Sequence, residues 1–473
     1  MAPERRPRSG TRDTRGDVTD NPILLTDSYK VSHHRQYPPG TQIVYSYFES
    51  RGGRFDEVVF FGLQYYLTRY LAGAVVRREH IDEAEAFFAA HFRGVDVFHR
   101  AGWEHVVRVH GGRLPVSIRA VPEGTSVPVR NVLMTIENTD PACFWLTNYL
   151  ETLLVQVWYG STVATLSREM KRLILSFLER TGDPSLIDFK LHDFGFRGVS
   201  SVESAAVGGA AHLVSFRGSD TLAGCLLAQR VYGASMAGFS IPAAEHSTQT
   251  AWGREHELDA YRNMLEQFPT GVVAVVSDSY DILHAVRELW GGALREAVLA
   301  RQGTLVIRPD SGDPAATVLE VMTILGERVG STTNAKGYRV LPPQVRVIQG
   351  DGVDYDEVGR VLATLEAHRW SADNVSFGIG GALLQKLHRD TQQFAFKCSS
   401  VVVDGQARDV YKTPVGDPGK ASKRGRLSLI RTADGYRTVR QGEAGPDLLQ
   451  EVFRDGEILV QQSWEEIRRR AAV

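Results

Sequence analysis

Seven similar segments follow one another between residues 186 and 381: LIDFKLHDFGFRG (186–198), HLVSFRGSDT (212–221), GFSIPAAEHS (238–247), VVAVVSDSYD (272–281), TLVIRPDSGD (304–313), VRVIQGDGVD (345–354) and NVSFGIGG (374–381). Each is a short apolar run that ends in polar or glycine residues. In most cases a stretch typical of an amphipathic helix follows. Buried strands that alternate with helices indicate a parallel sheet with right-handed crossovers. Seven such units predict an irregular (β/α) barrel, with an open doubly wound sheet as the alternative.

The sequence on both sides of this series has a different pattern. TQIVYSYFE (41–49) alternates and is rich in aromatic residues, and residues 104–137 resemble short strands broken by Gly and Pro. Near the C-terminus, FAFKCSSVVVDGQARDVYKTP and GRLSLIRTADGYRTVRQG alternate like antiparallel strands. Residues 140–180 and the terminal SWEEIRRRAAV have helical patterns, the first ending at Gly182.

These patterns predict the organisation of the chain. We expect residues 1–20 to be a disordered leader, because they contain almost nothing to bury. Residues 21–150 and 395–473 are expected to form one β-rich flanking domain. Residues 151–394 are expected to form the α/β barrel that carries the catalytic site.

Composition excludes several classes of protein. The chain has 473 residues, 43% of them hydrophobic, and Lys+Arg total 54 against Asp+Glu 56. This balance argues against a protein that coats a polyanion. The three cysteines are far apart, so neither a disulfide framework nor a CxxC zinc site follows. No apolar run approaches the roughly 20 residues of a membrane span, and no signal peptide is evident, so we expect a cytoplasmic protein.

The carboxyl ends of the seven predicted strands carry many charged residues and glycines. In a parallel barrel these ends meet on one face, where ligands bind. A single Asp there is most often a helix cap, but the succession predicts an active site. The residues are His192, Asp193, Arg197, Arg217, Asp220, Glu245, His246, Asp278, Asp281, Arg308, Asp310, Asp313, Asp351, Asp354, Gly378, Gly380 and Gly381.

Part of this set suits a phosphorylated, Mg²⁺-chelated substrate. The glycines of FGIGG (377–381) would let backbone N–H groups approach a phosphate, although a tight turn explains them equally well. The acids Asp310, Asp313, Asp351 and Asp354 could hold Mg²⁺ directly or through water. Salt bridges among these groups are the alternative. Cations for the phosphates are Arg308, Lys386, Arg389, Lys397 and Lys412.

Several of these strings, in this order, resemble the type II phosphoribosyltransferase family, and within it the nicotinamide phosphoribosyltransferases. They run from residue 21 to the C-terminus and are NPILLTDSYKVSHHRQYPPGTQIVYSYFESR, HDFGFRGVSS, FRGSDT, IPAAEHS, VVSDSYD, IRPDSGDP, VIQGDGVD, GIGGALLQKLHRD, FKCS and DPGKASKRGRLSL. The resemblance implies a homodimer with sites at the subunit interface. It implies transfer of phosphoribosyl from phosphoribosyl pyrophosphate to nicotinamide, giving nicotinamide mononucleotide and pyrophosphate in NAD salvage.

The resemblance assigns the pyridine site. Phe194 is expected to stack on one face of nicotinamide and Tyr29 of the second subunit on the other. Arg197 would contact the carboxamide or the ring edge, and Asp220 would accept the amide N–H. A carboxylate there attracts an amide donor and repels the carboxylate of nicotinate. Asp27, His192 and Ser240 complete the expected substrate contacts.

The resemblance also implies a histidine that ATP phosphorylates. His246 matches that position, and Asp278 could hydrogen-bond one imidazole nitrogen and leave the other nucleophilic. The phosphohistidine would favour substrate binding and catalysis, so ATP is consumed without being incorporated. Lys420 and Lys423 lie in a basic loop that could cover ATP; a solvated turn is an equal interpretation.

The remaining residues would bind the second substrate. Asp310 matches a ribose contact, with Arg308 beside it in the same site. Asp310 and Asp351 would meet Mg²⁺ through the pyrophosphate. Catalysis would come from positioning and from stabilising the leaving pyrophosphate. The expected pyrophosphate contacts are Arg51, Arg389, Lys397 and Lys412, and the expected 5′-phosphate and ribose cradle is Gly350, Asp351, Gly380 and Gly381.

The chain departs from the family pattern at three positions. Ala395 and Ala274 stand where serines are expected, and Phe196 replaces a tyrosine. Each change removes a hydroxyl group, which affects details of affinity and leaves the expected reaction unchanged. Three other functions stay open: nicotinate phosphoribosyltransferase, a Mg²⁺-dependent phosphate-ester hydrolase, and a non-catalytic protein of this fold.

Overall fold

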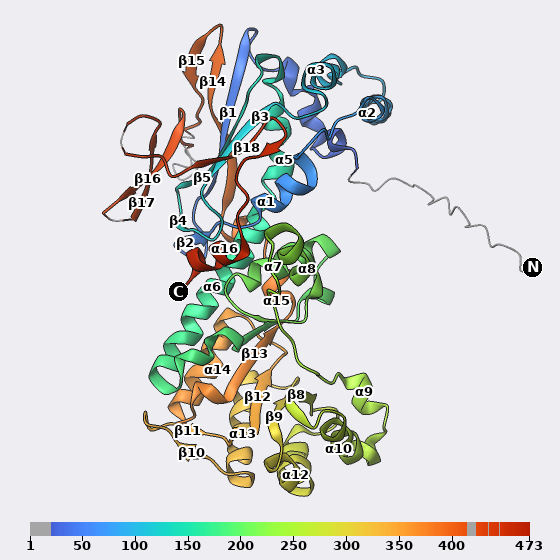
Figure 1. The fold of residues 1–473 in the computed structure, drawn as a ribbon, viewed down its shortest axis with the longest axis vertical. Coiled ribbons are helices and arrows are strands. Elements are labelled where there is room, and N and C mark those ends of the chain that lie inside the picture. Colours follow the sequence, from blue (N-terminus) through green and yellow to red (C-terminus); the bar gives the residue numbers. More distant parts are fainter. Residues whose placement is uncertain (1–19, 414–421, 434, 444) are drawn as a thin grey trace, which may run out of the picture.

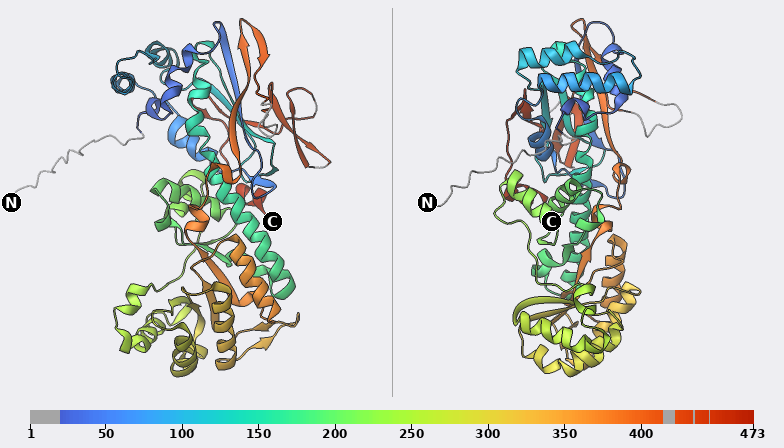
Figure 2. Two further views of the ribbon diagram at one scale, coloured as in Figure 1. Left: turned by 180° about the vertical axis from the view of Figure 1, so that it is seen from behind. Right: turned by 90° about the vertical axis from the view of Figure 1, so that its right-hand side faces the viewer.

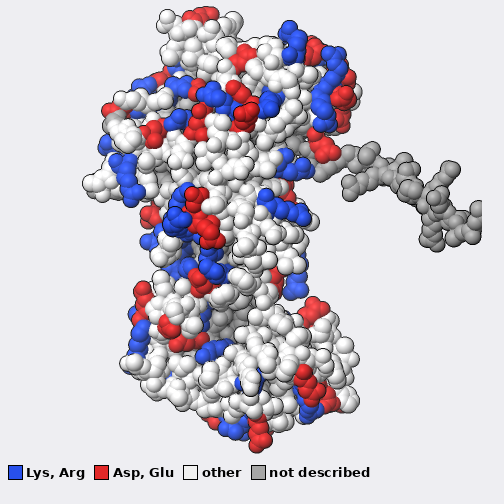
Figure 3. All heavy atoms as spheres, in the orientation of Figure 1, with Lys and Arg blue, Asp and Glu red and all other residues white. Residues whose placement is uncertain are grey.

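The computed structural model describes residues 20–413, 422–433, 435–443 and 445–473. It has an antiparallel sheet in its upper half and a parallel barrel in its lower half, with the long helix α6 (Val157–Thr181) running from their junction along the barrel (Figure 1). The two halves are also separate in both rotated views of Figure 2. On the face in Figure 3, acidic and basic side chains are interspersed over both halves. Among the described residues, we find no helix with the length and apolar character that a bilayer crossing requires.

The seven-stranded antiparallel sheet combines strands from both ends of the chain. Strand β1 pairs with β14 on one side and β5 on the other, so N- and C-terminal segments share one hydrogen-bonded layer. This confirms the predicted flanking domain built from two distant segments. In spatial order the strands are β15 (Gln406–Asp409), β14 (Phe394–Val403), β1 (Thr41–Ser50), β5 (Val132–Asn138), β3 (Val116–Ala120), β18 (Gln450–Arg454) and β19 (Glu457–Ile458).

Shorter elements complete the flanking domain. Two small antiparallel pairs are β2 (Glu57–Val59) with β4 (Ser126–Pro128), and β16 (Leu427–Thr432) with β17 (Gly435–Arg440). The helical elements are η1 (Pro22–Leu24), η2 (Ser28–Arg35), α1 (Leu63–Tyr66), η3 (Leu67–Leu71), α2 (Arg78–His91), α3 (Arg100–His110), η4 (Pro141–Cys143), α4 (Leu146–Tyr149) and α5 (Glu151–Leu154).

One part of the predicted strand region is helical. Residues 104–110 belong to α3, so the strand prediction was wrong there. Trp103 and Val106 are buried and three positions apart, which places them on one face of a helix. The helix ends at Gly111, whose φ of 60° lies in the left-handed region that glycine tolerates.

All seven barrel segments adopt their predicted places. Six form a parallel sheet, and residues 239–243 form bridges to both of its edges, at Gly218 and at Ala274. Because this one short segment pairs with both edge strands, the sheet closes into an irregular barrel. The alternative of an open doubly wound sheet is therefore excluded. The strands, in spatial order, are β7 (Gly218–Ser219), β6 (Leu191–Asp193), β13 (Val375–Ile379), β12 (Val345–Gln349), β9 (Gln302–Arg308) and β8 (Thr270–Val276).

Helices surround the barrel and bury its outer face in one large apolar cluster. The cluster also contains Trp464 and Ile467 of the C-terminal helix α16 (Trp464–Ala471), which returns from the flanking sheet to the barrel. The other elements are η5 (Pro184–Phe189), η6 (Phe196–Gly198), α7 (Val202–Leu213), α8 (Leu222–Tyr232), α9 (His246–Thr250), η7 (Arg254–His256), α10 (Glu257–Gln267), α11 (Ile282–His284), η8 (Ala285–Ala293), α12 (Arg295–Leu299), α13 (Pro314–Arg328), β10 (Thr332–Thr333), β11 (Arg339–Val340), α14 (Tyr355–Ala367), η9 (Ala372–Asn374), α15 (Gly381–Leu384) and η10 (Arg389–Thr391).

Candidate active site

Two adjoining pockets occupy the barrel where the predicted site residues gather. The first, of about 470 Å³, is lined mainly by apolar side chains and runs along the barrel interior. The second, of about 420 Å³, is lined by charged residues and glycines at the carboxyl ends of the strands. Phe194 and Arg308 line both, so the two pockets meet at these side chains.

Phe194 follows β6 and is held by its neighbours on the next strand. Its backbone N–H donates to the carbonyl of Ile379 at 2.9 Å. A Cβ at position 378 would lie 2.0 Å from Cε2 of the Phe194 ring, so only glycine at that position leaves room for the ring. Gly378 therefore has a packing role that places Phe194 between the two pockets.

The first pocket is a largely apolar slot with the carboxylate of Asp220 at its mouth, and Lys190, Arg308, Arg346 and Asp373 also line it. Ala274, Val306 and Ile348 project from three adjacent strands and pack with Phe194. At the exposed mouth, the Ser240 hydroxyl donates to the carboxylate of Asp220. A flat apolar ring with a hydrogen-bond donor fits this combination.

His192 also lines the first pocket. One of its ring nitrogens, Nε2, lies 3.0 Å from the carbonyl of Phe189. Burial lowers the pKa of His192, although Asp220 acts in the opposite direction. The ring is therefore neutral at pH 7, and Nε2–H donates to the carbonyl.

Sequence reasoning missed most of the apolar wall of the first pocket. Besides Ala274, the residues Ile241, Val306 and Ile348 were not singled out, because their side chains resemble those of any buried strand. The alternation of inward and outward positions along each strand is the signal that could have identified them. Alternate residues of a barrel strand point inward, and β8 and β9 bring Ala274 opposite Val306.

The second pocket collects most of the predicted phosphate and ribose contacts. Predicted residues that line it are Phe194, Arg197, Arg308, Asp310, Gly350, Asp351, Asp354, Gly380, Gly381 and Lys386. A Cβ on Gly381 would meet no protein atom within 4 Å, so the space in front of this turn is open to a ligand. Because α15 has only four residues, its backbone N–H groups would hold a phosphate without the help of a long helix dipole.

Arg197 lies apart from the carboxylate with which it was expected to share the amide. Arg197 lines the second pocket, whereas Asp220 lines the first. The structure therefore does not bring these two groups to one pocket. The position of Arg197 beside Gly380 and Gly381 suits contact with an anion.

Arg308 and Asp310 form a loose ion pair at the edge of the second pocket. Nε of Arg308 lies 3.5 Å from Oδ1 of Asp310, and within the described part of the chain this buried nitrogen has no hydrogen-bond partner. Burial raises the pKa of Asp310, and Arg308 partly offsets that rise. The guanidinium of Arg308 therefore keeps donor capacity for a bound anion.

His246 and Asp278 form the predicted pair. His246 begins α9, and its Nε2 lies 2.9 Å from Oδ1 of Asp278 at the end of β8. Because a carboxylate only accepts, Nε2 carries the proton. The Nδ1 atom has no partner among the residues that the structure describes, and 45% of the side chain is exposed. An accessible nitrogen lone pair on an oriented imidazole is what nucleophilic attack on a phosphate requires.

Three strand ends each carry two aspartates, the second three residues after the first. Asp281, Asp313 and Asp354 each accept backbone N–H groups as caps of the following helices. Asp313 also pairs with Arg360 at 2.7 Å and does not line the second pocket. A helix terminus therefore already uses the carboxylate of Asp313, outside the second pocket, whereas Asp354 caps α14 and also lines that pocket.

A separate group of cations lies on the flanking domain. Burial lowers the pKa of Lys397 on β14. Glu151 opposes this effect, while the charges of Arg51, Lys412 and Arg389 act in the same direction as burial. Arg51 donates from Nε to Glu49 at 3.0 Å, while its buried Nη2 has no hydrogen-bond partner among the described residues. Unpartnered and crowded positive groups indicate an anion site on this domain.

The predicted ATP loop is described in part. Lys420 lies outside the described residues. Lys423 pairs with Glu49 through Nζ, and its backbone N–H donates to the Tyr47 hydroxyl at 2.9 Å. Lys412 and Ser422 hydrogen-bond across the two ends of the loop. Lys423 and Arg51 thus share Glu49 as a partner.

Tyr29 and Asp27 also lie on the flanking domain, at η2. Tyr29 is 59% exposed and makes an edge contact with His33 at 5.1 Å. Asp27 accepts from the Thr152 hydroxyl at 2.8 Å. Neither residue lines the two barrel pockets, so one chain does not bring Tyr29 to Phe194.

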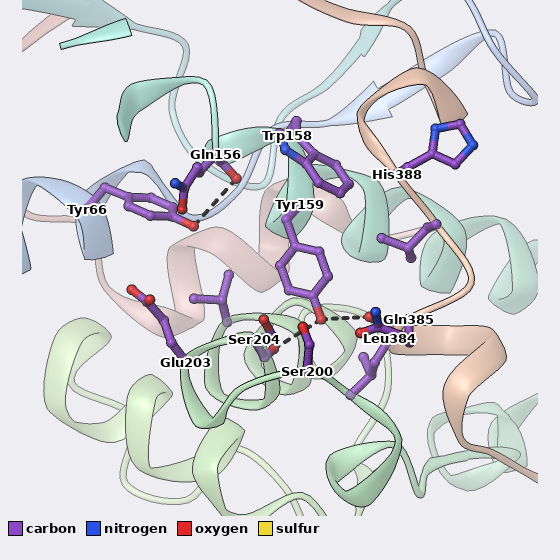
Figure 4. A pocket seen from close by; sticks show the side chains of 12 residues that line it. Tyr66, Gln156, Trp158, Tyr159, Ser200, Glu203, Ser204, Leu384, Gln385 and His388 are labelled. Atoms are coloured by element: carbon purple, nitrogen blue, oxygen red, sulfur yellow. Dashed lines mark hydrogen bonds between the residues drawn. The ribbon is translucent and has the colours of Figure 1, made fainter. Parts of the chain in front are cut away.

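A third cavity, of about 430 Å³, lies beside the glycine loop and contains none of the predicted site residues (Figure 4). The Tyr159 hydroxyl donates to the carbonyls of Leu384 at 2.8 Å and Ser204 at 3.1 Å. These bonds tie α6 to α15 and α7. The cavity therefore belongs to the packing that holds the glycine loop of the second pocket.

Comparisons with known proteins agree with this architecture. A model described as the nicotinate phosphoribosyltransferase (NAPRTase) family matches residues 189–457, and one described as the nicotinamide phosphoribosyltransferase N-terminal domain matches residues 21–118. A protein of Xanthomonas campestris named nicotinamide phosphoribosyltransferase is 53% identical over 96% of this chain and 98% of its own length. One of the same name from Acinetobacter baylyi is 35% identical over 96% and 97%.

Two solved structures share the fold at low identity. A nicotinate-nucleotide pyrophosphorylase from Pyrococcus furiosus has a TM-score of 0.60 at 15% identity, covering 97% of this chain and 96% of its own. The human nicotinic acid phosphoribosyltransferase has a TM-score of 0.54 at 17% identity, covering 95% and 93%. Together with the two matching models and the full-length relatives, the barrel and its flanking sheet show that the chain belongs to the nicotinamide phosphoribosyltransferase family.

Proposed function

We propose that this chain transfers the phosphoribosyl group of phosphoribosyl pyrophosphate to nicotinamide, giving nicotinamide mononucleotide and pyrophosphate. Family membership supports the reaction class. The single observation that carries the choice of substrate is the carboxylate of Asp220 at the mouth of an apolar pocket beside Phe194. A neutral amide donates to that carboxylate, whereas the carboxylate of nicotinate is repelled by it. Nicotinate phosphoribosyltransferase, the alternative, is for this reason not favoured.

The two pockets suit the two parts of the transfer. Nicotinamide would lie in the first pocket with its ring on Phe194, and the ribose phosphate in the second. The pyridine nitrogen attacks the anomeric carbon with its own lone pair while the C–O bond to pyrophosphate breaks, so no base is needed. Arg308 and Asp310, at the junction, would bind the substrate where the new bond forms. Positioning and charge stabilisation then supply the catalysis.

Mg²⁺ would enter this site with the pyrophosphate. Asp310 and Asp351 both line the second pocket, and Asp351 adds to the raised pKa of Asp310 after the larger effects of burial and of Asp278. Asp354 lines the same pocket but already caps α14, so two carboxylates remain for an ion that keeps waters and substrate oxygens in its shell. The ion would neutralise the leaving group, while the two aspartates orient it.

We also propose that ATP stimulates the reaction by phosphorylating His246. The bond between Nε2 and Asp278 supports this role, because it leaves Nδ1 as the nucleophile. Attack by Nδ1 on the γ-phosphorus of ATP would form the N–P bond as ADP leaves. Hydrolysis of the phosphohistidine would return the free imidazole and phosphate.

A homodimer would complete the site. Phe194 and Asp220 lie in the barrel, whereas Tyr29, Arg51 and Lys397 lie on the flanking domain. A twofold arrangement would bring the barrel of each subunit to the flanking domain of the other. The three cysteines are unpaired, which suits a reducing cytoplasm.

The composite site can be tested with two variants that are each inactive. Phe194→Ala removes a barrel group and Arg51→Ala removes a flanking group. If sites form between subunits, mixing and re-equilibrating equal amounts should restore about a quarter of the wild-type activity, because half of the dimers then contain one intact site. Mixtures that stay inactive after subunit exchange would contradict the shared site.

The reaction itself is tested by a product assay with each pyridine, with and without ATP. We expect nicotinamide mononucleotide and pyrophosphate from nicotinamide, formed faster when ATP is present. Turnover of nicotinate above that of nicotinamide would favour the alternative. Phosphate release without nucleotide would indicate a hydrolase, and an inert chain would indicate a non-catalytic protein.

A further inference from the structure

The flanking domain contains a cluster of potential metal ligands, none of which lines the two barrel pockets. We propose that His105, His110, Asp140 and Cys143 form a structural zinc site. One ligand atom from each of these four residues lies within 4.8 Å of the others. In the portions of the chain that the structure describes, no other group of three or more His, Cys, Asp or Glu side chains meets this condition.

Two segments 30 residues apart supply the ligands. His105 and His110 lie on the last turns of α3, which sits beside the antiparallel sheet in the upper half of the molecule (Figure 1). Asp140 caps η4 after β5, and Cys143 is the last residue of that short helix. The cluster therefore joins α3 to the turn that leaves a central strand of the sheet.

The contacts converge on one carboxylate oxygen. Nε2 of His105 and Nε2 of His110 each lie 2.7 Å from Oδ2 of Asp140. The two imidazole rings meet edge to face, at an interplanar angle of 62° and with their centroids 5.7 Å apart. The other oxygen, Oδ1, accepts from the backbone N–H of Ala142 at 2.8 Å, which fixes the carboxylate for its neighbours.

The donor set matches zinc. Two neutral imidazoles, a carboxylate and a thiolate carry two negative charges, which balance Zn²⁺, and nitrogen and sulfur ligands are those that zinc prefers. Bond lengths of about 2.0–2.3 Å place the ligand atoms of a tetrahedral site roughly 3.3–3.8 Å apart. The observed separations, from 2.7 Å to at most 4.8 Å, bracket this range. Small rotations of the two rings would open the cluster enough to admit the ion.

The cluster is closed on the protein side and accessible on the other. The side chain of Cys143 is fully buried, whereas those of His105, His110 and Asp140 are 24%, 23% and 20% exposed. Burial and the nearby Asp140 raise the pKa of the Cys143 thiol to about 12. Zinc binding would displace the thiol proton to solvent and form the Zn–S bond. Four protein ligands leave no open position, as in structural rather than catalytic sites.

Zinc binding is tested on the full-length chain after dialysis against a chelator. Competition with a chromophoric zinc indicator should give one tight site per chain. Cys143→Ser and His110→Gln should each weaken that site by at least about 100-fold, because each removes a direct ligand. His256→Gln is the matched control. Nδ1 of His256 lies 3.0 Å from Asp259, and within the described residues no further His, Cys, Asp or Glu side chain completes a metal cluster there. This substitution should therefore leave the zinc affinity unchanged.

Cobalt provides a measurement that needs no variant. Co²⁺ in place of zinc should give the intense visible bands of a tetrahedral ion and a near-ultraviolet thiolate charge-transfer band. Weak octahedral bands without the thiolate band would overturn the proposal. Zinc affinity that survives in the cluster variants but is lost in Asp310→Asn would assign the ion to the reaction site and also overturn it. A chain that binds no zinc would show that the cluster is a hydrogen-bonded network only.

Discussion

Replacing Asp220 with Ala should remove most of the preference for nicotinamide over nicotinate. Asp220 is the carboxylate at the mouth of the apolar pocket, oriented by the Ser240 hydroxyl. In the wild type the charge of Asp220 favours nicotinamide over nicotinate through two effects. It accepts a hydrogen bond from the amide and repels the acid.

The magnitude follows from the position of the group. A hydrogen bond to a charged acceptor contributes about 1.5–3 kcal/mol. Repulsion between carboxylates about 4 Å apart ranges from about 1 kcal/mol in water to about 4 kcal/mol at a partly buried site. Because Asp220 is exposed to solvent, the lower parts of both ranges apply. Their combined effect is about 3 kcal/mol, so the ratio of kcat/KM for the two pyridines should fall about 100-fold.

The assay measures kcat/KM for nicotinamide and nicotinate, with the KM for phosphoribosyl pyrophosphate as an internal control. That KM should change little, since Asp220 does not line the second pocket. Ser240→Ala is the matched variant, because it keeps the charge and removes only the hydroxyl that orients it. It should change the ratio several-fold at most. An unchanged ratio in Asp220→Ala would refute the role of the carboxylate.

Three further predictions follow from the site and its surroundings. His246→Ala should abolish stimulation by ATP while slow ATP-independent transfer continues, measured as nucleotide formation with and without ATP; full stimulation in this variant would remove the phosphohistidine. Gly378→Ala should lower kcat/KM for nicotinamide about 100-fold, because its Cβ would displace the Phe194 ring; Gly381→Ala, whose Cβ meets no protein atom, should instead affect the KM for phosphoribosyl pyrophosphate, and equal effects on both substrates would contradict this division. Burial raises the pKa of Asp193 to about 6, so the folded chain loses stability as pH rises from about 4 to about 6. Asp193→Asn cannot ionise, so above pH 6 its free energy of unfolding should exceed that of the wild type by about 3 kcal/mol, measured by denaturant unfolding across this range. A difference between the two proteins that is the same at every pH would refute this prediction.

The sequence was sufficient for the barrel because the signals are local. Each apolar run is followed by polar residues and then by a helical pattern, and all seven runs occupy barrel positions. The end of α6 at Gly182 was equally predictable, since glycine is a poor helix former and is common just after a helix. The strand prediction for residues 104–110 failed because short apolar runs near a helix end suit either structure.

The candidate site was predicted in its residues more fully than in its geometry. The pair of His246 with Asp278 appeared as expected, because both follow adjacent segments of the barrel. By contrast, Asp310 and Asp313 are both aspartates after the same strand, so residue type alone does not distinguish their roles. The first lines the second pocket, while the second caps α13 and pairs with Arg360.

By itself, then, the sequence determined the order of strands and helices, the family and the chemical groups at the ends of the strands. Those properties depend on residue type and on spacing along a single segment. Tertiary structure alone decided which groups share a pocket: it separated Arg197 from Asp220 and brought His105 and His110 to Asp140 and Cys143. Contacts of this kind join residues that are distant in the chain, so they depend on how the segments pack and not on any local pattern.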